Sequence, residues 1–156
     1  MKSIITAKLT RIILTILCLT SMGAHAMNQK AMEKTVKKHA QESRGEKGVV
    51  EFRYNGVDMM LISDVTHNRM RIITPVIAYE DLNEAQIYQI MDSNFHRALD
   101  ARYAVSDGVL YAAYIHPLSS LDKGSIKSAM LQVANLALSF DGEYTSGVLN
   151  FGDQEH

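Results

Sequence analysis

Apolar and polar positions alternate with a period of two through the middle of the chain. The stretch VVEFRY, residues 49–54, places apolar and charged side chains on opposite faces, as a half-buried strand does. Asn55 and Gly56 then supply the two positive-φ positions of a tight hairpin turn. The runs VDMMLIS and RMRIITPVI follow as two more strands, and Pro75 belongs at a strand end or a sheet edge because it cannot donate a ladder hydrogen bond. This pattern predicts a three-stranded meander.

A helical period replaces the alternation in LNEAQIYQIMDSNFHRALDAR. Asn83 and Gln86 stand at the two positions of a capping box, so the helix is predicted to begin there. Its predicted apolar face consists of Ile87, Met91, Phe95, Ala98 and Leu99. Asn94 lies on the same side, where an amide needs a hydrogen-bonding partner. We expect it either to bind the backbone of a neighbouring strand or loop, or to recognise the backbone of a bound chain.

A second hairpin and a final helix complete the pattern. Asp107 and Gly108 separate the strands YAVS and VLYAAYIHP. The last helix is predicted from about Asp122 to Asp141, and its main apolar face consists of Ile126, Met130, Val133, Ala137 and Phe140. A second apolar stripe on this helix predicts a self-association interface formed by Leu131, Ala134 and Leu138.

The order of the predicted elements is α-βββ-α-ββ-α. It predicts an α+β domain over residues 49–142, in which helices cover an antiparallel sheet of about five strands. Residues 27–48 are polar and form either a short, loosely attached helix that ends near Gly45 or a partly disordered leader. Residues 143–156 are expected to be an irregular tail, because the segment after Asp141 is glycine-rich.

Residues 56–141 resemble the YbjN-type proteins, a group that is similar to the type III secretion chaperones. The resemblance rests on the strands DMMLISD and RMRIITPV, the helix LNEAQIYQIMDSNF, the hairpin YAVSDGVLYAAYIHPL and the last helix MLQVANLALSFD. None of these motifs is catalytic. The resemblance implies a helix-covered sheet that is often dimeric and binds polypeptide segments. It therefore predicts a non-enzymatic, chaperone-like protein that forms a homodimer and has a polypeptide partner.

The first 26 residues have the three-part pattern of a secretory signal peptide. Lys2, Lys8 and Arg11 precede the apolar run IILTILCLTSMGA, and Ala24 and Ala26 place the cleavage point after residue 26. The run is shorter than the roughly 20 apolar residues that a membrane span needs. We therefore expect a periplasmic or secreted protein, which argues against a role in type III secretion, where chaperones of this fold work in the cytoplasm.

Cleavage would change the charge and the sulfur chemistry of the chain. It would remove Cys18, the only cysteine, so neither a disulfide nor thiol chemistry is expected. The mature chain would keep 13 basic residues against 17 acidic ones, a net charge of −4. A mildly acidic protein predicts no nucleic-acid partner and no membrane association after cleavage.

Candidate chemistry is sparse. Met60, His67 and Met70 carry the thioether and imidazole groups that hold copper, so a small-molecule or copper-binding protein of the periplasm is the alternative function. Core methionines beside a turn histidine are the plainer interpretation. The sequence contains no His-Glu-x-x-His and no Gly-x-Ser-x-Gly motif. It therefore predicts no catalytic residue, cofactor or enzymatic activity.

Overall fold

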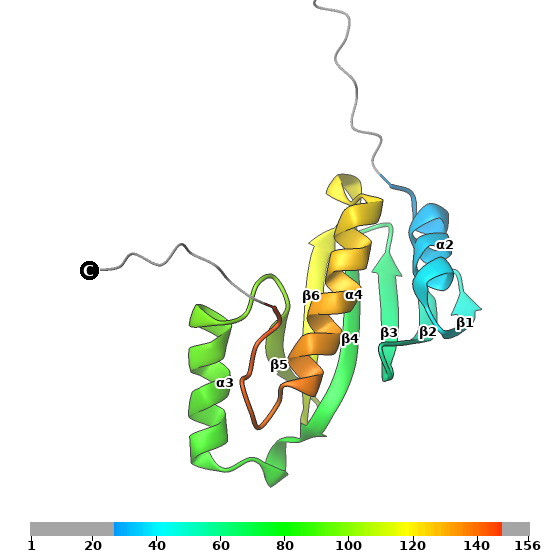
Figure 1. Ribbon diagram of the computed structural model, residues 1–156. Helices are drawn as coiled ribbons and strands as arrows, with labels where there is room; N and C mark the ends of the chain where they lie inside the picture. The colour runs from blue at the N-terminus through cyan, green and yellow to red at the C-terminus, as the bar shows by residue number, and fades with distance from the viewer. Residues whose placement is uncertain (1–26, 148–156) are drawn as a thin grey trace, which may run out of the picture.

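The computed structural model describes residues 27–147, which form one sheet with helices packed on it (Figure 1). The strands are β1 (Glu42–Glu46), β2 (Val49–Tyr54), β3 (Val57–Asp64), β4 (Arg69–Ala78), β5 (Arg102–Ser106) and β6 (Val109–Pro117). The helices are α2 (Gln29–His39), α3 (Glu84–His96) and α4 (Lys123–Leu138), and short 3-10 turns lie at Tyr79–Asp81 and Leu118–Ser120. Within the described range, no helix is long and apolar enough to cross a membrane.

The sheet is antiparallel throughout, with the strand order β1-β2-β3-β4-β6-β5. The predicted α+β fold and its element order are confirmed, but the sheet has six strands rather than about five. The additional strand is β1, which pairs with β2 and whose five residues, ESRGE, are all exposed. It has no apolar alternation, so the periodicity of the sequence could not identify it. Gly45 is required there, because its φ is +85° and a Cβ would lie 2.5 Å from the Val49 carbonyl oxygen.

Helix α2 is an integral part of the domain and not a loosely attached leader. It ends at His39, before the predicted limit near Gly45, because the following residues form β1. Met32 and Val36 are fully buried between the sheet and α4. The buried carboxylate of Glu33 accepts a hydrogen bond from the Gly48 backbone N–H at 2.8 Å. Polar and apolar contacts together therefore fix this helix on the domain.

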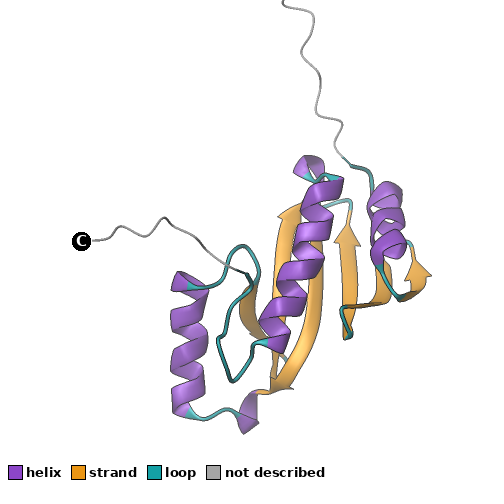
Figure 2. Cartoon of the chain, viewed as in Figure 1, coloured by secondary structure: helices purple, strands orange, loops and turns teal. Residues whose placement is uncertain are grey.

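Helices α2 and α4 cover the same face of the sheet, and α4 packs mainly on β4 and β6 (Figure 2). The core contains fully buried side chains from strands and helices, including Leu61, Met70, Ile72, Leu110, Ile126, Met130 and Val133. Each such side chain stabilises the fold by roughly 1.5–3 kcal/mol relative to leaving it exposed. Tyr103 also belongs to this core; its hydroxyl donates a hydrogen bond to the Leu136 carbonyl at 2.7 Å, and burial raises its pKa.

Asp122 is the N-cap of α4, and its charge makes the stability of this helix depend on pH. Its carboxylate accepts the Ser125 backbone N–H at 2.7 Å, and this hydrogen bond lowers the pKa of the carboxyl group. A lowered folded-state pKa means that the stabilisation is complete above the unfolded pKa of about 3.9. It is lost as the pH falls through the lower folded value.

We predict that the Asp122→Asn variant, which keeps the capping oxygen but not the charge, loses stability less steeply with acid than the wild type. Urea unfolding of both proteins at about pH 5 and about pH 3 measures this difference, and other carboxylates cancel in the comparison. Equal losses in the two proteins would contradict the prediction.

Helix α3 lies beside the sheet next to β5 and not over the sheet (Figure 1). The capping box of Asn83 and Gln86 at its start is confirmed. The segment that follows α4, residues 139–147, runs between α3 and α4 and is irregular. Ser93 of α3 donates its hydroxyl hydrogen bond to the Tyr144 carbonyl, and the Thr145 hydroxyl donates to the Arg97 carbonyl at 3.1 Å. This segment therefore ties α3 to the rest of the domain.

Candidate functional site: the open face of the sheet

One face of the sheet has no helix over it in the described part of the chain, residues 27–147 (Figure 2). We call it the open face. The strand register places apolar side chains at its centre, and these are Met60, Ile62, Ile73, Tyr111, Ala113 and Ile115. Most of them are half-buried by their neighbours, and Ile115 is 57% exposed. The open face therefore carries a continuous apolar centre that no segment of residues 27–147 covers.

A groove of about 740 Å³ opens on this face. Its apolar side is formed by Met60, Ile73, Pro75 and Tyr111. Its volume is in the range of sites that bury small ligands or the side chains of a bound chain. The groove extends the apolar centre of the open face toward β1 and β2.

The groove exists because the β3–β4 ladder stops early. Backbone pairing ends at Met60 and Ile73, although the same register would place Asp58 opposite Pro75. Pro75 has no N–H to give to that pair. The Thr74 hydroxyl takes its place and donates to the Asp58 carbonyl oxygen at 2.7 Å. Beyond this point β4 pairs with β6 alone, so the expected position of Pro75 at a sheet edge holds locally even though β4 is a central strand.

Two ion pairs form the charged side of the groove. Arg44 of β1 pairs with Glu51 of β2, and Arg53 of β2 pairs with Asp58 of β3 at 3.0 Å. All four side chains are substantially exposed, so the pairs contribute little to stability. Glu42 and Glu46 lie on the same side of β1 as Arg44 and are exposed, so this half of the open face has an excess of acidic residues.

The other half of the open face is positive. Strands β4, β5 and β6 contain no acidic residue, and they place Arg69, Arg71 and Arg102 on the open face. Within residues 27–147, none of these arginines forms an ion pair. Asp64 lies opposite Arg69 in the register but binds the His67 ring at 2.6 Å, a hydrogen bond that lowers the pKa of its carboxyl group. This half of the face can therefore receive carboxylates.

The three candidate copper ligands do not converge. Met60 is on the open face, Met70 is fully buried on the helix-covered face, and His67 is exposed in the β3–β4 turn. Met70 is three positions before Ile73, the cross-strand partner of Met60, so the two thioethers point to opposite faces. No cluster of three His, Cys, Asp or Glu side chains suited to a metal occurs among residues 27–147. The alternative of a copper site built from these residues is therefore not formed in this structure.

Asn94 binds the outer edge of β5. Its Nδ2 donates to the Tyr103 carbonyl at 3.0 Å, and its Oδ1 accepts from the Tyr103 N–H at 2.8 Å. The amide thereby replaces a strand neighbour at this position. Of the two roles considered for Asn94, the structure gives it the bond to a neighbouring strand.

The apolar face predicted for α3 is wrong in part. Met91 and Phe95 are 66% and 82% exposed, and Tyr88 beside them is 67% exposed. The helix buries Ile90 and Ser93 instead, because it packs against the edge strand β5 and residues 139–147 and not over a face of the sheet. We call Tyr88, Met91 and Phe95 the α3 stripe. The spacing of the sequence indicated an amphipathic helix, but it did not distinguish the side that faces the domain.

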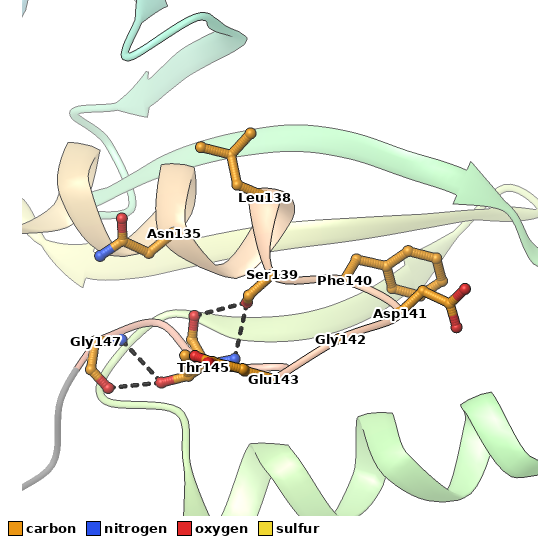
Figure 3. Close-up of a pocket in the computed structure, with 9 residues that line it drawn as sticks. All are labelled: Asn135, Leu138, Ser139, Phe140, Asp141, Gly142, Glu143, Thr145 and Gly147. Atoms are coloured by element: carbon orange, nitrogen blue, oxygen red, sulfur yellow. Dashed lines mark hydrogen bonds between the residues drawn. The ribbon is translucent and has the colours of Figure 1, made fainter.

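The predicted self-association stripe of α4 is not one continuous surface. Leu131 and Leu138 are exposed, but Ala134 is fully buried in the core. A second cavity, of about 580 Å³, lies where α4 ends, and Leu138 is at its rim (Figure 3). The polar groups around this cavity are paired with one another, as in the two hydrogen bonds between Ser139 and Thr145 at 2.8 and 2.9 Å. We therefore assign no ligand to it.

Comparisons with known proteins identify solved structures that share this fold. No family model matches the chain, and no curated protein matches it. Three solved structures cover 70% of this chain. They are the HopA1–SchA chaperone–effector complex (TM-score 0.54, 11% identity, 88% of that chain) and the ExsC–ExsE complex (0.53, 15%, 90%). The third is the Yersinia pestis type III secretion chaperone SycH in complex with a stable fragment of YscM2 (0.52, 12%, 98%).

The fold is that of the type III secretion chaperones. Because the identities are low, the likeness to these chaperones extends to the fold alone. The function has to be argued from the surfaces of this chain, and within its described residues one apolar face of the sheet is uncovered.

Proposed function

We propose that this protein is an exported, non-enzymatic, YbjN-like protein that binds a polypeptide segment on the open face of its chaperone-like sheet. The observation that carries the proposal is the apolar centre of this face, with the groove beside it. Exposed apolar surface rimmed by charges is typical of protein-binding sites. The fold supports the same role, since the similar structures are described as chaperones bound to effectors or fragments. The signal-peptide pattern of residues 1–26 supports export.

The chemistry of the open face specifies the kind of segment that fits. An extended chain across the face would bury apolar side chains against Met60, Ile73 and Ile115. Arg69 and Arg71 are two residues apart on one strand, so their side chains lie about 6–7 Å apart along it. Carboxylates at alternate positions of an extended segment have the same spacing and bind guanidinium groups well. The preferred partner is therefore a segment that combines apolar and acidic residues.

Site-specific photo-cross-linking tests this proposal. A photoreactive amino acid at Tyr111, on the open face, should give a cross-linked polypeptide of defined mass when the chain is expressed in its own host. The same group at Lys127, which is exposed on α4, serves as the matched control and should not give that product. A second variant, Ile73→Glu, should abolish the Tyr111 product, because a carboxylate then lies in the apolar centre beside the groove. The same products from Tyr111 and Lys127, or a product that is insensitive to Ile73→Glu, would contradict the proposal.

We also propose that the protein is a homodimer in which two copies of the α3 stripe face each other. Tyr88, Met91 and Phe95 follow one another at helical spacing and are the most exposed apolar cluster on α3. In an antiparallel pair related by a two-fold axis near Met91, Tyr88 of one copy would meet the partner's Phe95. Such a contact is self-complementary and closes after two copies.

A further inference from the structure

Helix α2 presents a face that consists of lysines. Lys30, Lys34, Lys37 and Lys38 are all exposed and fall on one side of the helix, within about 100° at the helical period. We call them the lysine face. The opposite side of α2 is buried in the core. In the described part of the chain, none of these four lysines forms an ion pair.

Neighbouring elements extend this positive surface. Lys123 and Lys127 are exposed on the first two turns of α4, which packs on α2, and both helices begin at the same end of the domain (Figure 1). Two nearby acidic groups are already engaged: Glu33 is buried and binds the Gly48 N–H, and Asp122 caps α4. Glu42 and Glu46 of β1 are exposed beside Lys37, which donates to the Gly45 carbonyl at 2.6 Å, so Lys30, Lys34 and Lys38 carry most of the free positive charge of the lysine face.

The charges of the two types are separated across the molecule. Around α3, at the opposite end of the domain from α2, the acidic residues include Glu80, Asp81, Glu84, Asp92, Asp141 and Glu143 (Figure 1). The end of the domain away from α2 is thus mainly acidic. A molecule with such a distribution would approach an anionic surface with the lysine face first.

We propose that the lysine face docks this protein onto a bilayer that contains anionic phospholipids. Each lysine close to such a surface increases partitioning roughly fivefold, so four are enough for reversible attachment. No large apolar side chain of α2 is exposed, so attachment is electrostatic and needs no insertion. The net charge of the sequence predicts no membrane partner; the separation of charges in the fold changes that expectation.

Two observations favour a bilayer over nucleic acid. The lysine face contains neither arginine nor aromatic residues, the side chains with which proteins bind phosphates bidentately and stack on bases. In addition, α2 begins at Gln29, the third residue after the predicted cleavage point, so on the proposed export, on which this argument rests, it would emerge beside a membrane. Docking through α2 leaves the open face free, because that face lies on the other side of the sheet. The proposal is thus independent of polypeptide binding.

Vesicle flotation of the full chain tests the proposal. Phosphatidylcholine vesicles, with or without phosphatidylglycerol, are compared at low and high salt. The full chain should float with the anionic vesicles at low salt and be released at high salt. The N-terminal segment, with its apolar run and Lys2, Lys8 and Arg11, is the same in every variant, so the comparison of variants cancels its contribution.

Two triple variants with equal changes in net charge locate the docking surface. Lys30→Gln, Lys34→Gln and Lys38→Gln together should lower partitioning onto anionic vesicles roughly a hundredfold. Their counterpart on the open face, with glutamine in place of Arg69, Arg71 and Arg102, should lower it much less. In the photo-cross-linking assay at Tyr111, the arginine variant should lose product and the lysine variant should keep it. Failure of one proposal is therefore distinguishable from failure of the other.

Three results would overturn the bilayer assignment. The first is equal binding to neutral and anionic vesicles. The second is equal loss in the two triple variants, with thermal unfolding showing that both are folded. The third is tighter binding to a fluorescent DNA duplex than to anionic vesicles at the same salt concentration, lost in the lysine variant, which would identify the lysine face as a nucleic-acid surface.

Discussion

Replacing Phe95 by glutamate should convert the proposed homodimer into monomers. Phe95 is 82% exposed, so the change has little effect on the fold of one copy. In the dimer, however, each copy would bring a carboxylate into the apolar contact between the two α3 stripes. An unpaired buried charge costs several kcal/mol, and the contact contains two of them. We expect the dissociation constant of the dimer to rise by more than about a hundredfold.

Light scattering coupled to size exclusion measures this change as a fall from twice the chain mass to the mass of one chain. The matched controls are Leu131→Glu and Leu138→Glu, which place the same charge at exposed apolar positions of α4. These variants should remain dimeric if the α3 stripe is the interface. A dimer that survives Phe95→Glu but dissociates with Leu131→Glu or Leu138→Glu would instead support self-association through α4.

The Asn94→Ala variant should lose about 2–3 kcal/mol of unfolding free energy. Both hydrogen bonds of the Asn94 amide go to the backbone of Tyr103, a residue that is 5% exposed. Alanine leaves that N–H and that carbonyl without their partner, and a buried unsatisfied polar group costs about 1–3 kcal/mol. The variant also uncovers the outer edge of β5, so we expect it to aggregate more readily than the wild type.

Urea unfolding of Asn94→Ala beside Lys127→Ala measures the loss. Lys127 is an exposed helical residue, so its replacement should change stability by less than about 0.5 kcal/mol. A similar small effect of Asn94→Ala would mean that water or a shifted side chain satisfies the Tyr103 backbone. In that case Asn94 would not be the group that closes the sheet edge.

Local patterns along the sequence were enough to predict the central elements of the fold. The alternation in residues 49–54 and the turn at Asn55 and Gly56 correspond to β2 and its hairpin with β3. The capping box at Asn83 places the start of α3. These signals are local, because hydrogen bonds within a turn or a first helical turn need no distant partner.

The parts that could not be predicted depend on contacts between distant segments. Strand β1 has the sequence of a polar loop and is a strand because β2 pairs with it. Met91 and Phe95 have the spacing of a core face, but residues 139–147 occupy the other side of α3. Which apolar stripe is buried depends on where a helix packs, and the periodicity of the helix contains no information on that.

The sequence predicted only some features of the candidate site. Alternation in β3 indicates that Met59 and Met60 lie on opposite faces, but not which face the helices leave open. For Pro75 the sequence indicated a strand end or a sheet edge, but not the groove beside it. The lysines of α2 were visible in the sequence, yet their importance arises from the burial of the opposite side of the helix.

The tie between residues 139–147 and α3 sets an order of assembly for the chain. Most of the core of the sheet, α2 and α4 comes from residues 27–138, but the Ser93 hydroxyl and the Arg97 carbonyl bond to Tyr144 and Thr145, which come later in the chain. A chain that folds from its N-terminus would therefore complete the sheet first and seat α3 last. Because the α3 stripe takes its final position only at that step, pairing of two copies in the proposed dimer would wait until residues 144 and 145 are in place.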